Sequence, residues 1–410
     1  MPHYRTKIIQ WVIISLLISI ATGLLSSLFL QILSFATNQR EENKLFVYFL
    51  PLAGLIIGLA YYFLSKGVEG GNNLLITEMD SPKRSIHWKI IPLVFFGTIA
   101  THLFGGSAGR EGTAVQMGGA LGDQIQKLFK WTRLRRKTIL RMGVAGGFAG
   151  VFGTPFAGVV FAVEFAKDRK LSLSYLFLST LTAFGSHYIC MATGAHHAKY
   201  NVNLLPDYSI DTIFWIITLG LVFGLTAWIF SLSKLGFERI FNKLSIPFIR
   251  PFIGGLVLLM LYLLFDFDRF MGLGIPTIQH AFENIASFED PWIKLILTAI
   301  TLGAGFKGGE ATPLFFMGAL LGSSLAIWIP LPFSFMAGAG FVAVFGAATN
   351  TPYASSLIAA ELFGFEGLPF YLITCLTAYI ISGKTSVYDT QQPLLRKVSI
   401  RNSWAKKRHN

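Results

Sequence analysis

The chain alternates between long apolar stretches and short polar ones from one end to the other. About 20 apolar residues suffice for a helix to cross a lipid bilayer, so the pattern predicts an all-α, polytopic membrane protein. Several stretches are shorter and many contain Gly or Pro, which predicts broken helices and favours a transporter or channel with a midplane site. The apolar stretches are residues 11–36, 45–65, 90–104, 139–165, 174–193, 212–233, 252–265, 291–302, 313–329, 333–348, 354–363 and 368–381.

Two short motifs occur once in each half of the chain. Residues 109–113 (GREGT) and 309–313 (GEATP) are each followed, at the same spacing, by Met-Gly and then Leu-Gly. This pair of motifs and the pair given next are separated by nearly the same number of residues, which indicates an internal duplication. The second pair of matching segments is residues 154–157 (TPFA), which lead to Glu164, and residues 351–354 (TPYA), which lead to Glu361.

The duplication predicts two transmembrane halves, residues 1–205 and residues 206–410. The first half holds candidate loops near residues 70–75 and 109–113, and the second holds one near residues 308–313 and a short basic tail. The sequence does not say whether the halves run parallel or inverted. The inverted arrangement is the commoner one where broken helices meet at a site.

The composition supports a membrane protein, with 53% hydrophobic and 13% charged residues. The net charge of +13 does not indicate a nucleic-acid partner, because the basic residues gather at the chain ends and in short loops. Residues 127–141 contain seven basic residues and no acidic one, and the tail after Asp389 is also basic. The positive-inside rule therefore places both termini on the cytoplasmic side of a multi-pass protein in the cell membrane.

The loop around Glu111 carries the strongest chemical signal. A charged pair at membrane depth is costly and suggests function. Gly109 and Gly112 let the backbone bend, and a helix start just after them offers free N–H groups to an anion. We interpret Glu111 as a carboxylate that competes with a small anion for this site when ionised and swings away when protonated. The alternative is that Glu111 pairs with Arg110 and only ties down a turn.

The duplication places a second loop opposite the first. In the shared register Glu310 aligns with Arg110 and Thr312 aligns with Gly112, so the match is not residue for residue. Each loop still supplies one carboxylate and one hydroxyl: Glu111 and Thr113 in the first loop, and Glu310 and Thr312 in the second. If the halves meet about a pseudo-two-fold axis, two helix N-termini converge near the midplane. An anion held there by donors without a full fixed charge can bind and still leave.

Two further segments offer candidate ligands. Asn72 and Asn73 follow two glycines and predict a helix start whose amides face the entry, with an ordinary Asn N-cap as the equal alternative. Tyr388 follows the last apolar stretch. A phenol at that place is typical of an interfacial anchor, and its functional role would be an O–H group directed at the anion.

Other polar residues are interpreted structurally. Glu164 and Glu361 close apolar stretches, which favours solvated or helix-end roles over a proton path. Cys190 and Cys375 lie far apart in apolar stretches and are predicted to be packing residues. The four histidines at positions 102, 187, 196 and 197 show no ligand spacing, so we expect neither a metal site nor a cofactor.

These motifs resemble those of the CLC family of chloride channels and anion/proton antiporters. Residues 109–112 match its GREG motif, and residues 144–165 are similar to its Gly-rich helix pair. The resemblance covers most of the chain. It implies a fold of two inverted halves and a homodimer with a separate pathway in each subunit.

The departures from the family pattern resemble its fluoride-transporting branch. Thr113 replaces the proline of GREGP, GNNLL at residues 71–75 replaces GSGIP, and GEATP at residues 309–313 replaces GxFxP. The internal proton-relay glutamate of the chloride/proton antiporters aligns with Phe165 in this chain. A GLGIP sequence does occur at residues 272–276, but it lies in the second half and cannot stand for the GSGIP loop of the first half. By this resemblance Glu111 would be the gating glutamate and Glu310 a second essential carboxylate. The implied anion ligands are Asn72, Thr312 and Tyr388.

The sequence therefore predicts a fluoride/proton antiporter in the lipid bilayer that exports fluoride. Fluoride is small and strongly hydrated, so hydroxyl, amide and aromatic ring-edge donors suit it better than a pocket for a larger ion. The alternative is a chloride-selective CLC channel or chloride/proton antiporter. An intramembrane enzyme with Glu111 and Glu310 as paired carboxylates is disfavoured, because the chain lacks HExxH, GxSxG and a His/Asp partner.

Overall fold

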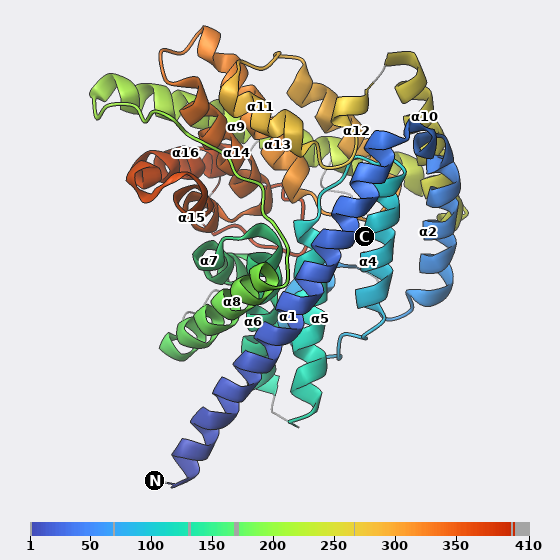
Figure 1. The fold of residues 1–410 in the computed structure, drawn as a ribbon, viewed down its shortest axis with the longest axis vertical. Helices are drawn as coiled ribbons and strands as arrows, with labels where there is room; N and C mark the ends of the chain where they lie inside the picture. The colour runs from blue at the N-terminus through green and yellow to red at the C-terminus, as the bar shows by residue number, and fades with distance from the viewer. Residues whose placement is uncertain are drawn as a thin grey trace.

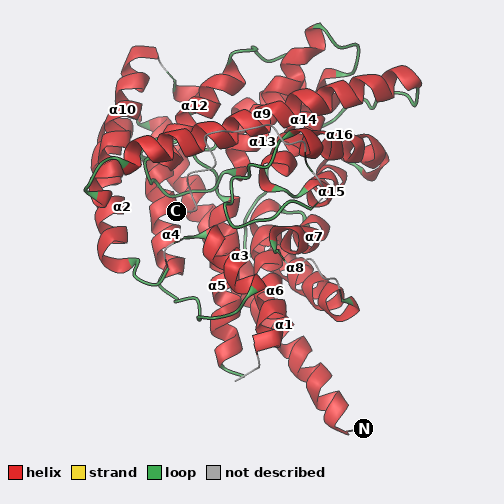
Figure 2. Ribbon diagram, turned by 180° about the vertical axis from the view of Figure 1, so that it is seen from behind, coloured by secondary structure: helices red, strands yellow, loops and turns green. Residues whose placement is uncertain are grey.

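The computed structural model describes residues 2–68, 70–129, 133–167, 172–265, 267–394 and 397, and within them all regular structure is helical (Figure 1, Figure 2). The helices of the first half are α1 (Pro2–Glu42), α2 (Leu50–Leu64), α3 (Asn72–Asp80), α4 (Ile90–Leu103), α5 (Glu111–Lys127), α6 (Arg133–Phe152), α7 (Pro155–Phe165) and α8 (Leu173–Ala192). Those of the second half are α9 (Ile210–Asn242), α10 (Arg250–Phe265), α11 (Ile275–Glu283), α12 (Asp290–Gly303), α13 (Ala311–Ser324), α14 (Phe333–Thr349), α15 (Pro352–Phe363) and α16 (Leu368–Ile381).

Within the described residues, four segments are long and apolar enough to cross a membrane. They are Ile9–Glu42, Lys44–Leu64, Ile210–Asn242 and Pro247–Phe265. Most of the other helices are shorter, as predicted for broken helices. Polar backbone at membrane depth is tolerated only where protein buries it or where it lines a cavity.

The breaks occur where the sequence forces a turn. Gly105 ends the α4 turn with φ 91°, and Gly305 ends the α12 turn with φ 100°, a region that favours glycine. The apolar stretch 139–165, predicted as one segment, is two helices. α6 and α7 are separated at Gly153, whose φ is 85°, and Pro155 begins α7.

The two halves meet in an antiparallel arrangement. The Gly109 N–H donates to the Gly309 carbonyl oxygen at 2.6 Å, and the Gly309 N–H donates to the Gly109 carbonyl oxygen at 2.6 Å. Reciprocal bonds between equivalent residues are what a two-fold axis produces. These bonds agree with the expected two-fold relation between the two halves, and the border between residues 205 and 206, in the connection from α8 to α9, stays a prediction.

A second reciprocal contact joins α7 and α15, which lie side by side in both views (Figure 1, Figure 2). Glu164, near the end of α7, accepts bonds from the backbone N–H groups of Tyr353 and Ala354 at 3.3 and 2.7 Å. Glu361, near the end of α15, accepts them from Phe156 and Ala157 at 3.0 and 2.7 Å. Each carboxylate thus satisfies the free donors at the start of the opposite helix.

The repeated Met-Gly pairs are explained by helix packing. A Cβ on Gly118 of α5 would overlap the carbonyl oxygen of Gly143 in α6, and a Cβ on Gly318 of α13 would overlap that of Gly340 in α14. Glycine lets each helix pair approach at backbone distance. Cys190 and Cys375 are buried and free, as expected of packing residues.

Among the basic residues of the C-terminal tail, the structure describes Lys397, which is buried. Its ammonium donates to the Ser382 hydroxyl at 2.8 Å and lies 4.4 Å from the centre of the Tyr379 ring. The other basic residues of the predicted tail, Arg396, Arg401, Lys406, Lys407 and Arg408, lie outside the described residues.

Candidate functional site

Two helix N-termini begin at the point where the halves meet. α5 starts at Glu111 after Arg110, and α13 starts at Ala311 after Glu310, with no side-chain cap on either helix. There is no space for larger residues at the crossing. A Cβ on Gly309 would lie 2.7 Å from the Gly112 nitrogen, and one on Gly109 would lie 2.9 Å from the Thr312 nitrogen. Helix N-termini carry partial positive charge, so this junction suits a negative group.

The Glu111 carboxylate occupies the junction. Its Oε2 accepts a bond from the Thr312 hydroxyl at 2.7 Å and from the Thr312 backbone N–H at 3.2 Å. The Arg110 backbone N–H donates to the same oxygen at 3.3 Å, and the Arg110 Nε lies 3.6 Å from Oε1. The side chain is 2% exposed. Glu111 therefore pairs with Arg110, as the alternative interpretation held, but its shortest bond crosses to the other half of the molecule.

Thr113, the last residue of the GREGT motif, bonds to α4 and not to the Glu111 carboxylate. The Thr113 hydroxyl is buried and lies 2.7 Å from that of Thr98 on α4. The Thr98 carbonyl in turn bonds the ring of His102, which also bonds the carbonyl of Ala108. Thr113 and His102 thus fix the loop in place, and His102 is a core histidine as predicted.

Glu310 lines a cavity. Its Oε1 accepts a bond from the Lys234 ammonium of α9 at 2.6 Å. A Cβ on Gly112 would lie 3.7 Å from the Glu310 Oε2 and 3.2 Å from the Asn72 amide nitrogen. The second oxygen of Glu310 therefore remains close to the start of α5.

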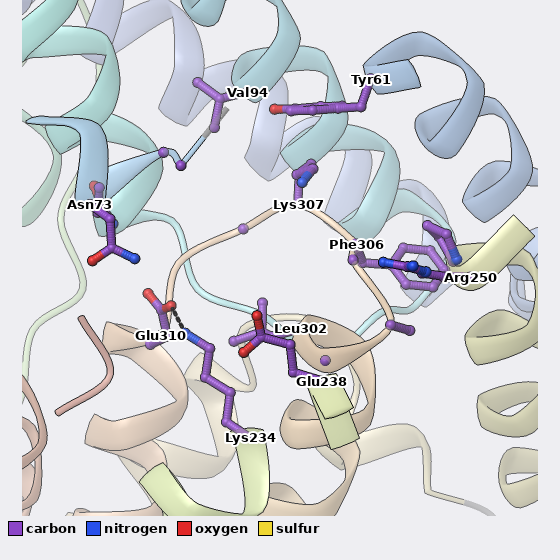
Figure 3. Close-up of a pocket in the computed structure, with 18 of the residues that line it drawn as sticks. Tyr61, Asn73, Val94, Lys234, Glu238, Arg250, Leu302, Phe306, Lys307 and Glu310 are labelled. Atoms are coloured by element: carbon purple, nitrogen blue, oxygen red, sulfur yellow. Dashed lines mark hydrogen bonds and ion pairs between the residues drawn. The ribbon is translucent and has the colours of Figure 1, made fainter. Parts of the chain in front are cut away.

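The cavity has a volume of about 600 Å³ and extends from the Glu310 loop to the turn between α9 and α10 (Figure 3). It brings together residues that are far apart in the sequence. Those with polar side chains near its inner end are Asn72, Asn73, Gln116, Lys234, Lys307, Glu310 and Tyr388. Glu238 and Arg250 line it too, and Figure 3 shows Arg250 on the side away from Glu310.

Asn72 and Asn73 have different roles. α3 starts at Asn72, its N-cap is Gly71, and no side chain caps it, so the ordinary Asn N-cap interpretation is wrong. Asn72 is 7% exposed, and its buried Oδ1 has no hydrogen-bond partner. The Asn73 Oδ1 instead accepts bonds from the Thr390 hydroxyl and backbone N–H at 3.0 and 3.3 Å. Asn72 is the amide with unused hydrogen-bonding capacity.

Tyr388 is buried, with 4% of its surface exposed, so it is not an interfacial anchor. Its ring meets that of Phe165 edge to face, with centroids 5.2 Å apart. Phe165 continues into a stack with Phe161, which stacks on Phe148 at 4.5 Å. Apolar rings therefore surround the Tyr388 side chain on the α7 side of the site.

Of the two roles expected for Glu164 and Glu361, solvated or helix-end, the structure shows the helix-end one, and Glu164 is only 3% exposed. Both carboxylates lie near the end of their own helix and cap the other one. Sequence reasoning also missed two cavity residues, Lys234 and Gln116. A lone lysine just after the apolar stretch 212–233 was an available signal, since charges inside membrane helices are rarely neutral to function. Among the described residues no group of three His, Cys, Asp or Glu side chains could hold a metal ion.

The comparisons with known proteins place this fold in a family of membrane transport proteins. A family profile described as voltage gated chloride channel matches residues 53–383. The chain belongs to this voltage gated chloride channel, or CLC, family.

Two relatives show what the chain resembles within the family. It is 41% identical over 397 residues to a chloride/fluoride channel protein of Pseudomonas syringae pv. tomato, covering 94% of this chain and 87% of the relative. It superposes on the crystal structure of a CLC-type fluoride/proton antiporter with a TM-score of 0.90 and 34% identity, covering 95% and 99% of the two chains. A slow cyanobacterial Cl⁻/H⁺ antiporter shares the fold, with a TM-score of 0.79 and 20% identity over 91% and 94% of the chains.

Proposed function

We propose that this protein exports fluoride in exchange for protons through a site gated by Glu111. The observation that carries the proposal is the position of the Glu111 carboxylate. It accepts bonds from a hydroxyl and backbone N–H groups where two helix N-termini meet, and an anion would need the same donors. The similarity to a fluoride/proton antiporter and to a chloride/fluoride channel protein supports fluoride as the anion.

In this proposal Glu111 alternates between two places. Ionised, it occupies the anion site and blocks it; protonated, it leaves, and fluoride takes over the donors of Thr312. Asn72, Asn73 and Tyr388 line the cavity through which fluoride arrives. The backbone of Gly109, Arg110, Gly112 and Thr113 shapes the start of α5. Dehydrating fluoride is costly, and hydroxyl and amide donors offset that cost.

Protons would travel on the carboxylates of the pathway. The internal glutamate of the chloride/proton antiporters corresponds to Phe165 here, which is buried among aromatic rings. Glu111 would therefore carry the proton itself, with Glu310 as a helper on the cavity side. The process moves ions without a catalytic step and needs no cofactor.

We propose a cell-membrane protein with both termini in the cytoplasm and with residues 1–205 and 206–410 as its two halves. We propose a homodimer with one pathway in each subunit. The resemblance to the CLC family supports this proposal, since exposed apolar side chains such as Phe156, Phe177 and Tyr353 suit lipid as well as a second subunit.

The second candidate is a chloride channel or chloride/proton antiporter, and the family description favours it. Liposomes containing the purified protein separate the two. We expect a fluoride gradient to drive proton movement, and an equal chloride gradient to drive much less. Equal flux of the two anions would favour the chloride candidate, and fluoride flux without proton movement would overturn antiport.

A further inference from the structure

Lys234 is a charged residue in a long apolar helix. It lies in α9, one of the four segments long and apolar enough to cross the membrane. A lone ammonium in such a helix is costly unless it is paired or faces water. Its side chain points into the cavity and toward Glu310 (Figure 3).

The ammonium links two parts of the candidate site. It donates to the Glu310 Oε1 at 2.6 Å and to the Val387 carbonyl oxygen at 3.2 Å. Val387 directly precedes Tyr388. Lys234 therefore holds the carboxylate in front of α13 and the backbone that positions the phenol, while the second oxygen of Glu310 stays beside Gly112.

Lys234 is the cation that forms an ion pair with Glu310 in the described part of the chain. Among the other charged or titratable groups around the pair, Glu238 lies on α9 itself, one turn after Lys234. Arg250, Lys307, Tyr388 and Asp389 line the same cavity from other elements, and Glu111 begins α5. The Lys307 ammonium lies 3.9 Å from the centre of the Tyr61 ring, so it faces the cavity wall.

The charge balance of the pair couples two ions. While Glu310 is ionised, its negative charge offsets that of the ammonium and weakens the attraction of Lys234 for an anion. When Glu310 takes up a proton, an O–H bond forms on the carboxyl, the ion pair breaks, and the ammonium keeps its three hydrogens. The pair would then carry one unbalanced positive charge in a poorly solvated place, which a fluoride ion from the cavity neutralises.

We propose that Lys234 changes partner during transport, binding the Glu310 carboxylate when that group is ionised and incoming fluoride when it is protonated. Joint arrival of a proton and a fluoride ion leaves the net charge of the pair at zero, whereas either ion alone does not. This inference rests on the proposed exchange of fluoride for protons. It assigns to Lys234 a role in coupling and in anion binding.

Fluoride binding to the full-length protein tests the proposal, measured by isothermal titration with sodium fluoride. Glu310→Gln imitates the protonated carboxyl, so it should bind fluoride more tightly than the wild type does. Adding Lys234→Met to this variant should weaken binding about 10-fold, the size expected for a hydrogen bond to a charged group. Adding Lys234→Arg, which keeps the charge and the donors, should restore most of the affinity.

Lys307→Met in the Glu310→Gln background is the matched control, because it removes the same charge from the same cavity. We expect it to weaken binding much less. Equal losses from the two lysine variants would overturn the proposal, since the cavity charge alone would then explain binding. No loss from Lys234→Met would overturn it as well.

Size-exclusion chromatography decides whether each variant is folded. If Lys234→Met does not elute with the wild type, Lys234→Gln replaces it and the same outcomes apply. Proton movement driven by fluoride in wild-type liposomes is measured alongside. Its absence would overturn the proposed function, whereas wild-type exchange with unchanged binding in the lysine variants would overturn this inference alone.

Discussion

The loops at residues 109–113 and 309–313 share one backbone arrangement and differ in chemistry. Both precede a helix, both follow a glycine turn, and their first residues, Gly109 and Gly309, bond each other reciprocally. The carboxylates nevertheless occupy adjacent register positions, at Glu111 in the first loop and at Glu310 in the second. Glu111 reaches across to Thr312, whereas Glu310 faces the cavity and Lys234.

This difference gives a symmetric scaffold a direction. Equivalent positions on inverted halves face opposite ways, so identical side chains would make the two sides of the site alike. Arg110 and Glu310 are equivalent, and only Glu310 lines the cavity. By contrast, the reciprocal caps of Glu164 and Glu361 are nearly identical in the two halves. Symmetry is preserved where it stabilises the fold and is lost where the ions pass.

Replacing Glu111 should have the largest effect. Glu111→Gln keeps the shape of the side chain but cannot carry a proton, so coupled exchange should fall by at least about 100-fold, as for loss of an essential acid or base. Proton movement in liposomes under a fluoride gradient measures this. Glu111→Asp, which keeps the acid, is the control. Near wild-type exchange in Glu111→Gln would remove Glu111 from the role of gate.

Removing the hydroxyl of Thr312 should have the next largest effect. Thr312→Ala deletes the shortest bond to Glu111, and a hydrogen bond to a charged group contributes enough to change turnover about 10-fold. Thr312→Ser keeps the hydroxyl and should retain most of the exchange rate in the same flux assay. If Ser and Ala were equally impaired, the methyl group of Thr312 would matter more than its hydroxyl.

The crossing of the two loops can be tested through stability. Gly309→Ala would place a Cβ 2.7 Å from the Gly112 nitrogen, where the backbone must move, at a cost of about 1–3 kcal/mol. Gly236→Ala in α9 is the control, because no atom lies within 4 Å of the added Cβ and alanine favours a helix. Thermal unfolding in detergent should show a lower Tm for Gly309→Ala alone. Equal Tm values would contradict the close approach of the loops.

The two helix caps should show the smallest effects, and equal ones. Glu164→Gln and Glu361→Gln each remove a negative charge from the start of the opposite helix, which should cost about 1 kcal/mol in each case. The Tm in detergent measures both. If one variant kept a Tm close to that of the wild type but lost most of its fluoride exchange, the replaced glutamate would belong to the ion pathway. The two caps would then not be equivalent.

The sequence predicted the fold well, because hydrophobic length and duplicated motifs determine it directly. The pair of Glu111 and Thr312 was also predictable, since both belong to repeated loops. Three things were not. The role of Thr113 depends on Thr98, a partner outside the loop. The reciprocal caps depend on how α7 and α15 pack. Lys234 contacts Glu310 from 76 residues away, and no local pattern reports a pairing over such a distance.

Fluoride-driven proton movement in liposomes containing the wild-type protein tests the central claim most directly. The vesicles start with a fluoride gradient directed outward and with equal pH on both sides. The account predicts that fluoride efflux drives protons into the vesicles, so that their interior becomes more acidic than the medium. It predicts no such uptake in vesicles containing Glu111→Gln. Fluoride efflux without proton uptake, or proton uptake of the same size with chloride alone, would contradict the account.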